Sequence, residues 1–369
     1  MNKARYLMIG GFLGAGKTTT IQKFAQWLDA KGLKVGLITN DQGQGLVDSA
    51  LGRSNKFAVE EISGGCFCCR FNSLIDAARN LTEETRPDVF LAEPVGSCTD
   101  LVATVSLPLQ KIYGDDYQVA PLSVLVDPVR ALRVLGLEPG KKFSENVRYI
   151  YRKQLEEAEM IVINKIDILD EERLKTLREG LKKEFSEAQI FEQSARDEIN
   201  LETWFNAASE TEMNVPRFLD IDYQRYGDGE ALLGWLNTTV EIRSDEEFDG
   251  NQLLRDLANQ LRESLGKEGA EVAHLKMTLT PLGDPFEIAA VNMVRDDQSP
   301  ELSHQLFEPL EDGELLLNMR VETSPELLEK ASNDALNSVL SGFDFKITHS
   351  EHFRPGMPVP THRFAEETA

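Results

Sequence analysis

The sequence predicts an α/β fold for about its first two hundred residues, a mostly parallel sheet with helices on both faces, followed by a smaller α+β domain. Three observations predict it. Short apolar runs alternate with amphipathic segments. The apolar runs lack the polar alternation of a half-exposed strand, so we expect both faces of each to be buried. Beyond residue 233, the order of the expected strands and helices changes.

Seven apolar runs are expected to form the strands of the first sheet. Amphipathic segments lie between them, such as residues 71–84, where Leu74, Ala78 and Leu81 fall on one helical face. The expected strands cover residues 6–10, 34–40, 56–62, 88–93, 121–127, 160–164 and 188–194.

A polar stretch near residues 210–232, which contains Gly227 and Gly229, interrupts this pattern and indicates a connection between domains. After it, the expected order is strand, helix, two strands, a strand-like run, helix and strand, which is close to a split βαβ arrangement. The expected divisions are a first domain over 1–212, a linker over 213–232, a C-terminal domain over 233–350 and an extended tail over 351–369.

Composition and charge exclude several classes of partner. The 62 acidic and 39 basic residues give a formal net charge of -23, which would repel nucleic-acid phosphates and anionic lipid head groups. Four cysteines in 369 residues cannot form a disulfide framework and fit a reducing compartment. No apolar run is long enough for a signal segment or a membrane span. We therefore expect a soluble cytoplasmic protein without nucleic-acid or membrane partners.

Residues 11–18, GFLGAGKT, match the phosphate-loop pattern GxxxxGK[ST] between an expected strand and an expected helix. Its glycines permit a tight turn that directs backbone N–H groups at phosphate oxygens, Lys17 reaches the terminal phosphates, and the Thr18 hydroxyl coordinates Mg²⁺. A chance glycine turn of this form occurs in roughly one chain in a hundred of this length. The residues predicted to bind the phosphates are Gly11, Gly14, Ala15, Gly16, Lys17, Thr18 and Thr19.

The motif NKID at residues 164–167 indicates which base is bound. Asp167 would accept hydrogen bonds from N1–H and the N2 amine of guanine, and adenine offers neither donor. Asn164 and Lys165 would brace this loop. Ser194 and Ala195 follow the next expected strand, where a backbone N–H could contact the base oxygen. Together with the phosphate loop, the motif predicts GTP.

Two acidic residues at strand ends are candidates for the catalytic part of this site, because phosphoryl transfer depends on positioning and charge stabilisation. Asp41, in TNDQG, is predicted to orient water or Mg²⁺. Glu93 and Gly96, in LAEPVG, are predicted to form a loop that senses the γ-phosphate. The alternative for each acid is an ordinary solvated carboxylate at the end of a strand.

Three of the four cysteines occur within ISGGCFCCRF, at Cys66, Cys68 and Cys69. The two preceding glycines allow the backbone to turn so that the thiols converge, and the helix expected from Phe71 favours thiolates at its N-terminus. Thiolates are soft ligands, so zinc is the first choice of metal, with cobalt or nickel open. A buried structural cysteine cluster and a redox dithiol are the alternatives.

The motifs GGFLGAGKTT, NDQG, GGCFCC, ExxG and NKID, in that order, resemble those of the CobW-type GTPases, relatives of the urease and hydrogenase maturation GTPases. The resemblance covers about the first two hundred residues. It implies a P-loop GTPase that acts as a metallochaperone, with metal on the three neighbouring cysteines. GTP hydrolysis would then drive delivery to a client metalloprotein with a zinc or cobalt centre, including one of the corrinoid type.

The sequence departs from the family pattern at three places. NDQG at residues 40–43 replaces the usual NEFG, and a histidine-rich segment is missing. The fourth cysteine, Cys98, occurs in EPVGSCTD, and we hypothesise that it completes a four-thiolate site in one nucleotide state. A buried, structurally inert Cys98 is the alternative. His349, His352 and His362 suggest a second, weaker metal site, or surface histidines in a flexible tail.

Two other functions remain open at this stage. A regulatory GTPase with a purely structural zinc would not release its metal without unfolding. A P-loop kinase for a small molecule would need an acceptor pocket, and the NKID motif argues against it. The sequence also leaves a homodimer open.

Overall fold

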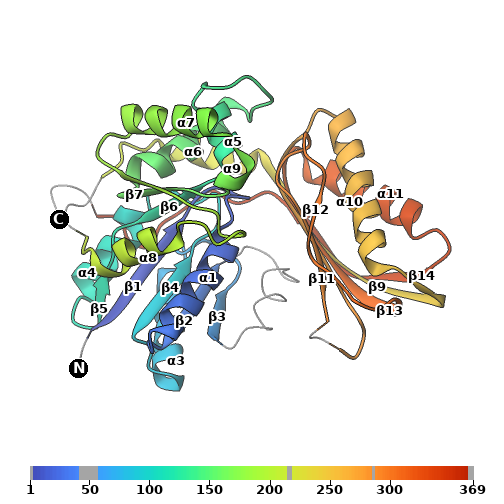
Figure 1. The fold of residues 1–369 in the computed structure, drawn as a ribbon, viewed down its shortest axis with the longest axis horizontal. Helices are drawn as coiled ribbons and strands as arrows, with labels where there is room; N and C mark the ends of the chain where they lie inside the picture. Colours follow the sequence, from blue (N-terminus) through green and yellow to red (C-terminus); the bar gives the residue numbers. More distant parts are fainter. Residues whose placement is uncertain (1–2, 41–56, 214–217, 285–286, 365–369) are drawn as a thin grey trace. The chain divides into compact units, whose positions relative to one another are not determined.

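The computed structural model of the chain describes residues 3–40, 57–213, 218–284 and 287–364 (Figure 1). The chain forms two compact units. Apart from the gaps, the first unit takes in residues up to Gly229 and again from Met357, and the second takes in residues from Glu230 to Gly356. The C-terminal segment thus returns to the first unit. No helix in these described ranges is long and apolar enough to cross a membrane.

The first unit contains an eight-stranded sheet with the order β3-β2-β4-β1-β6-β7-β8, in which β5 also pairs with β1. Every pairing is parallel. The seven expected strands are confirmed, and β5, only three residues long, is an addition. The strands are β1 (Ala4–Gly10), β2 (Val35–Asn40), β3 (Ala58–Ile62), β4 (Val89–Glu93), β5 (Tyr117–Val119), β6 (Ser123–Val126), β7 (Met160–Ile163) and β8 (Gln189–Glu192).

Both faces of this sheet are covered, as the unbroken apolar strands predict. Side chains of Leu7 and Ile9 on β1 pack in one core with helices α1 (Lys17–Ala30) and α8 (Leu201–Glu210). The rings of Phe24 on α1 and Phe205 on α8 stack in this core, with their centroids 4.2 Å apart. The alternate residue Met8, on the opposite face, is equally buried. Figure 1 shows α1 lying across β1, β2 and β4.

Helices connect the parallel strands of the first unit. Helix α3 has the bounds predicted from its apolar spacing. A turn of π-helix (Val102–Ser106) precedes α4, and a 3₁₀ turn (Ile166–Ile168) follows β7. The α-helices are α1 (Lys17–Ala30), α3 (Phe71–Glu84), α4 (Leu107–Ile112), α5 (Pro128–Val134), α6 (Glu145–Glu157), α7 (Glu171–Glu184), α8 (Leu201–Glu210) and α9 (Tyr223–Ala231).

The second unit is the predicted α+β arrangement. Its six-stranded antiparallel sheet has the order β12-β11-β10-β13-β9-β14, and α10 and α11 pack side by side on it (Figure 1). Strand β12 is the addition to the expected order. The elements are β9 (Leu233–Phe248), α10 (Gly250–Lys267), β10 (Glu271–Thr280), β11 (Ala289–Met293), β12 (Glu301–His304), β13 (Leu310–Glu322), α11 (Pro325–Val339) and β14 (Asp344–Phe353).

The region expected to be a linker contains helix α9. Two glycines of this helix allow other parts of the chain to pack closely against it. A Cβ on Gly227 would lie 1.9 Å from Met357 Sδ, and one on Gly229 would lie 2.7 Å from the Asn146 carbonyl oxygen. Close approach, which only glycine permits, therefore explains both residues. The start of the expected tail continues β14, and residues from Met357 pack on the first unit.

Candidate nucleotide and metal site

The phosphate loop joins β1 to α1, as its sequence predicts. Gly11, Gly14 and Gly16 have φ angles of 128°, 79° and 88°, which favour glycine. A Cβ on Gly11 would lie 2.3 Å from the Leu125 carbonyl oxygen, and one on Gly16 would lie 2.4 Å from Asn164 Nδ2. These two glycines are therefore required by conformation and by space.

Two of the predicted phosphate-site residues, Lys17 and Thr18, lie at the start of α1 beside Glu93. Lys17 Nζ donates to the Gly11 carbonyl oxygen at 2.9 Å and lies 3.9 Å from Glu93 Oε1. The Thr18 hydroxyl donates to the same Glu93 oxygen at 3.1 Å. Thr19, by contrast, is exposed. Asp41 lies outside the described residues, so its predicted role stays a prediction.

The loop that follows β4 packs against the phosphate loop. A Cβ on Gly96 would lie 2.9 Å from the backbone nitrogen and side chain of Leu13, so the two loops touch here. Gln154 Nε2 on α6 donates to the carbonyl oxygens of Gly96 at 2.9 Å and Cys98 at 2.8 Å. Gln154 is absent from the predicted site, although a polar residue among the buried positions of an amphipathic helix is a signal that could have indicated it.

The NKID loop is fastened to the phosphate loop by its own side chains. Asn164 Nδ2 donates to the Ala15 carbonyl oxygen at 2.9 Å, and Asn164 Oδ1 accepts from the Ala195 N–H at 3.1 Å. Lys165 Nζ donates to the Gly14 carbonyl oxygen at 2.7 Å and to Asp127 Oδ2 at 3.0 Å. The expected bracing role of Asn164 and Lys165 thus has a specific geometry.

Asp167 has one carboxylate oxygen in use and one without a partner. Its Oδ2 forms an ion pair with Arg196, a residue that the sequence analysis did not single out. Its buried Oδ1 has no hydrogen-bond partner among the residues that the structure describes. A buried unsatisfied carboxylate oxygen is costly, and the two adjacent donors of guanine would satisfy it. Nearby, Ser194 Oγ accepts from the Asp197 N–H.

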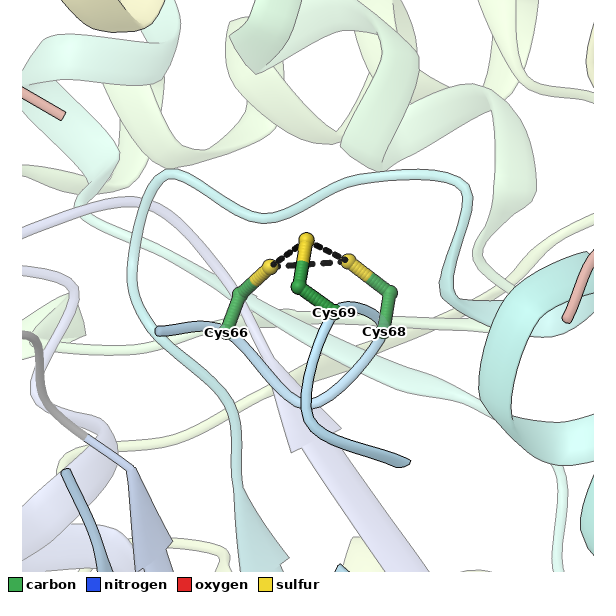
Figure 2. A group of neighbouring side chains, drawn as sticks. All are labelled: Cys66, Cys68 and Cys69. Atoms are coloured by element: carbon green, nitrogen blue, oxygen red, sulfur yellow. Dashed lines mark hydrogen bonds between the residues drawn. The ribbon is translucent and has the colours of Figure 1, made fainter. Parts of the chain in front are cut away.

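The three neighbouring cysteines converge in space (Figure 2). The sulfur of Cys66 lies 2.8 Å from that of Cys68 and 3.1 Å from that of Cys69, and the last two are 3.7 Å apart. A metal ion could be held by three or more Cys, His, Asp or Glu side chains whose ligand atoms lie within 4.8 Å of one another, and these three cysteines are such a group within the described residues. We call it the thiol cluster.

The backbone before and within the thiol cluster turns sharply. Gly64 and Gly65 have positive φ angles, as the glycine pair predicts. Asn40 Nδ2, at the end of β2, donates to the Ile62 carbonyl oxygen at 2.9 Å and the Gly65 carbonyl oxygen at 2.7 Å. The N–H groups of residues 69 and 70 both donate to the Cys66 carbonyl oxygen, which closes the turn.

The donor set fits a soft or borderline metal ion. Tetrahedral zinc with Zn–S bonds of about 2.3 Å has sulfur atoms about 3.8 Å apart. The Cys68–Cys69 separation of 3.7 Å already matches, and Cys66 would need to move outward by about 1 Å. Three thiolates would leave one of four tetrahedral positions open, which suits zinc or cobalt.

The protons of the thiol cluster are unevenly shared. Hydrogen bonds from Cys68, then Cys69 and Cys98, hold the pKa of the Cys66 thiol well below its ordinary value. Cys68 and Cys69 each form a hydrogen bond with Cys66. These bonds raise the pKa of the Cys68 thiol and raise the pKa of the Cys69 thiol to about 11. Cys66 is therefore the thiol of the cluster that ionises most readily, and Cys68 and Cys69 hold their protons more strongly than usual. A metal that binds all three must displace those protons.

The C-terminal segment covers the thiol cluster, which the sequence did not indicate. The Val359 N–H donates to Cys69 Sγ at 3.3 Å, and the Thr361 N–H donates to the Cys68 carbonyl oxygen at 2.8 Å. The His362 ring packs edge-on against Phe71 at 5.0 Å. This contact contradicts a flexible location for His362, and His349 and His352 belong to strand β14 of the second unit.

Comparisons with known proteins agree on a family. The model of the CobW/HypB/UreG nucleotide-binding domain matches residues 5–192, just over half of the chain. The chain is 32% identical over 193 residues to the zinc chaperone CobW of Sinorhizobium sp, which covers 47% of this chain and 53% of that protein. It is 27% identical over 202 residues to zinc-regulated GTPase metalloprotein activator 1 of Dictyostelium discoideum, covering 47% and 42%.

Two further matches are longer. The zinc chaperone YjiA of Escherichia coli is 27% identical over 269 residues, covering 71% of this chain and 81% of that protein. The Zn(II)-bound YjiA GTPase structure from E. coli has 19% identity and a TM-score of 0.40, covering 92% and 99%. The matched segments span about half the length of the first two relatives.

Proposed function

The chain belongs to the CobW/HypB/UreG family, and from that premise we propose that it is a GTP-hydrolysing metallochaperone that delivers a metal ion to a client metalloprotein. The observation that carries the proposal is the convergence of three thiols within the same unit as a complete phosphate loop and guanine motif. A nucleotide site alone would suit many GTPases. A thiol cluster in the same unit would hold a metal ion, and GTP hydrolysis could then control the release of that ion.

On the nucleotide side, each proposed role follows from a contact described above. The backbone of the phosphate loop and Lys17 would hold the phosphates, and Thr18 with Glu93 would hold Mg²⁺ through oxygen ligands. The unsatisfied Asp167 oxygen would accept from guanine. Asp41 keeps its predicted role with water or Mg²⁺. Catalysis would come from positioning and charge stabilisation, as in other phosphoryl transfers.

On the metal side, Cys66, Cys68 and Cys69 would hold the cargo. Zinc is the first choice, because thiolates bind it well and because the relatives named above are called zinc chaperones. Cobalt fits the same ligands. Arg70 Nη2 donates to the Gly64 carbonyl oxygen, and this contact helps to hold the turn that presents the thiols.

The nucleotide half is tested by exchanging the base preference. Asp167→Asn replaces an acceptor oxygen by an amide donor, which complements the second carbonyl of xanthine instead of the guanine amine. We expect GTP hydrolysis at low substrate to fall at least a hundredfold and XTP hydrolysis to rise correspondingly. Retained GTP preference in the variant would contradict the assignment of Asp167. XTP turnover serves as the internal control for folding.

The metal half is tested by transfer. The zinc-loaded protein is mixed with a chromogenic chelator in the presence of GDP, GTP or a non-hydrolysable GTP analogue. We expect release to depend on the nucleotide, and the triple Cys→Ser variant at the thiol cluster to bind no zinc while still binding GTP. Zinc that leaves only when the protein unfolds would favour a regulatory GTPase with a structural metal instead.

A further inference from the structure

Cys98 lies beside the thiol cluster, although it is 29 residues away from Cys69 in sequence. Its side chain is 1% exposed, and it forms a hydrogen bond with the Cys66 thiol. It remains outside the group of three sulfurs that all lie within 4.8 Å of one another. Cys98 thus contacts the Cys66 thiol but does not belong to the group of three closely spaced sulfurs.

The segment that carries Cys98 also carries the residue that contacts the phosphate loop. Glu93 accepts from the Thr18 hydroxyl, Gly96 packs on Leu13, and Cys98 follows two residues after Gly96. The six residues from Glu93 to Cys98 can span at most about 20 Å even when fully extended. A displacement at the phosphate site would therefore reach Cys98 through a short length of chain.

Gln154 connects two residues of this loop to each other. Its amide nitrogen donates to the carbonyl oxygens of both Gly96 and Cys98, so the two residues are tied to the same buried atom of α6. The Cys98 N–H donates to the Val95 carbonyl oxygen at 2.9 Å, which adds a turn within the loop. Gly96, which is predicted to sense the γ-phosphate, and Cys98, which lies beside the thiol cluster, are thus held to each other through one side chain.

We propose that Cys98 is the fourth sulfur ligand of the metal and that its loop engages or withdraws it according to the bound nucleotide. The inference rests on the proposed function. On engagement a metal–sulfur bond forms, the Cys98 S–H bond breaks, its proton passes to solvent, and a water molecule leaves the fourth metal position. Four thiolates would bind the ion more tightly than three, so withdrawal lowers affinity and favours delivery.

The experiment counts sulfur ligands directly. Zinc-edge X-ray absorption of the loaded wild type, with GDP and with a non-hydrolysable GTP analogue, is expected to give four Zn–S distances of about 2.3 Å in one state and three in the other. This measurement needs no variant. Three sulfurs in both states would overturn the ligand assignment, and four in both would overturn its dependence on nucleotide.

Cobalt substitution provides the variant arm. We expect Cys98→Ser to lose about a quarter of the sulfur-to-cobalt charge-transfer intensity in the four-sulfur state and none in the other. Cys69→Ser is the matched control and should lose intensity in both states. An unchanged Cys98→Ser spectrum in both states would overturn the proposal. A wild type without any charge-transfer band would instead defeat the proposed function, so the two failures are distinguishable.

Discussion

Glu157, at the end of α6, is fully buried and supports the segment that follows Cys98. Its Oε1 is 3.0 Å from the Thr99 hydroxyl, and its Oε2 accepts from the Val102 N–H at 3.2 Å. Burial, with the nearby charge of Asp100, raises the pKa of Glu157 from 4.5 to about 8. The carboxyl group is therefore protonated in the folded protein at pH values where it is ionised in the unfolded chain.

This difference makes the stability of the first unit depend on pH in a defined direction. The stabilisation by the protonated group is fully present below the unfolded pKa of 4.5 and is lost as pH rises through the folded value of about 8. Each pH unit in that window corresponds to about 1.4 kcal/mol. Between pH 6 and pH 8, the free energy of unfolding should fall by about 2 to 3 kcal/mol.

Glu157→Gln removes this titration while it keeps the contacts. The Gln amide nitrogen can donate to the Thr99 hydroxyl, and its oxygen can accept from the Val102 N–H. We therefore expect the variant to resemble wild type in stability near pH 6 and to exceed it by about 2 kcal/mol at pH 8.5.

Urea denaturation at half-unit steps between pH 6 and pH 9 measures this difference. Glu156→Gln is the matched control, because it neutralises an adjacent carboxylate whose pairing with Lys153 lies at the surface and contributes little. Parallel pH profiles for wild type and Glu157→Gln would refute the reasoning. So would a variant that is destabilised equally at every pH.

Three further predictions concern the ligands. Arg196→Ala should tighten GTP binding up to about fivefold in titrations with a fluorescent analogue, because Arg196 must release Asp167 before guanine binds; weaker binding would contradict this. Deleting residues 357–369 should raise the alkylation rate of Cys69 several-fold, since Val359 and Thr361 cover it; an unchanged rate would show that the segment does not shield the thiol. Zinc affinity, measured by chelator competition in the nucleotide state in which Cys98 is withdrawn, should rise by up to about a hundredfold per pH unit near neutrality, because the two thiols with raised pKa values, Cys68 and Cys69, must each lose a proton; a pH-independent affinity would contradict this proton arrangement.

The sequence predicted those parts of the fold in which one chain segment contains its own signal. The five central strands among the seven expected, β1, β2, β4, β6 and β7, are largely apolar on both faces, and α3 follows a strict helical spacing, so neither depends on knowing what it packs against. The role of a glycine could not be predicted in this way, because it depends on the residues that pack against it. Gly227 and Gly229 indicated a break in the chain, but their role becomes visible only beside Met357 and Asn146.

The same distinction applies to the candidate site. Motif residues such as Lys17, Asp167 and the three neighbouring cysteines are identified by local spacing alone. Arg196, Gln154 and the C-terminal segment enter the site through contacts between distant parts of the chain. Gln154 leaves a local trace as a polar residue at a buried helical position. Arg196 and the C-terminal segment leave none, because any exposed arginine or extended segment has the same sequence appearance.

Three buried amides share one task, and this explains how separate loops form one site. Asn40 joins the end of β3 to the glycine turn before the thiol cluster, Gln154 joins Gly96 to Cys98, and Asn164 joins the phosphate loop to Ala195. An amide can satisfy two loop backbones at once without the desolvation cost of a buried charge. Replacing one by leucine would leave two buried polar groups unsatisfied, at about 1 to 3 kcal/mol each. Neutral hydrogen bonds therefore hold the backbone segments of the site to one another, and no additional buried charge is needed for this purpose.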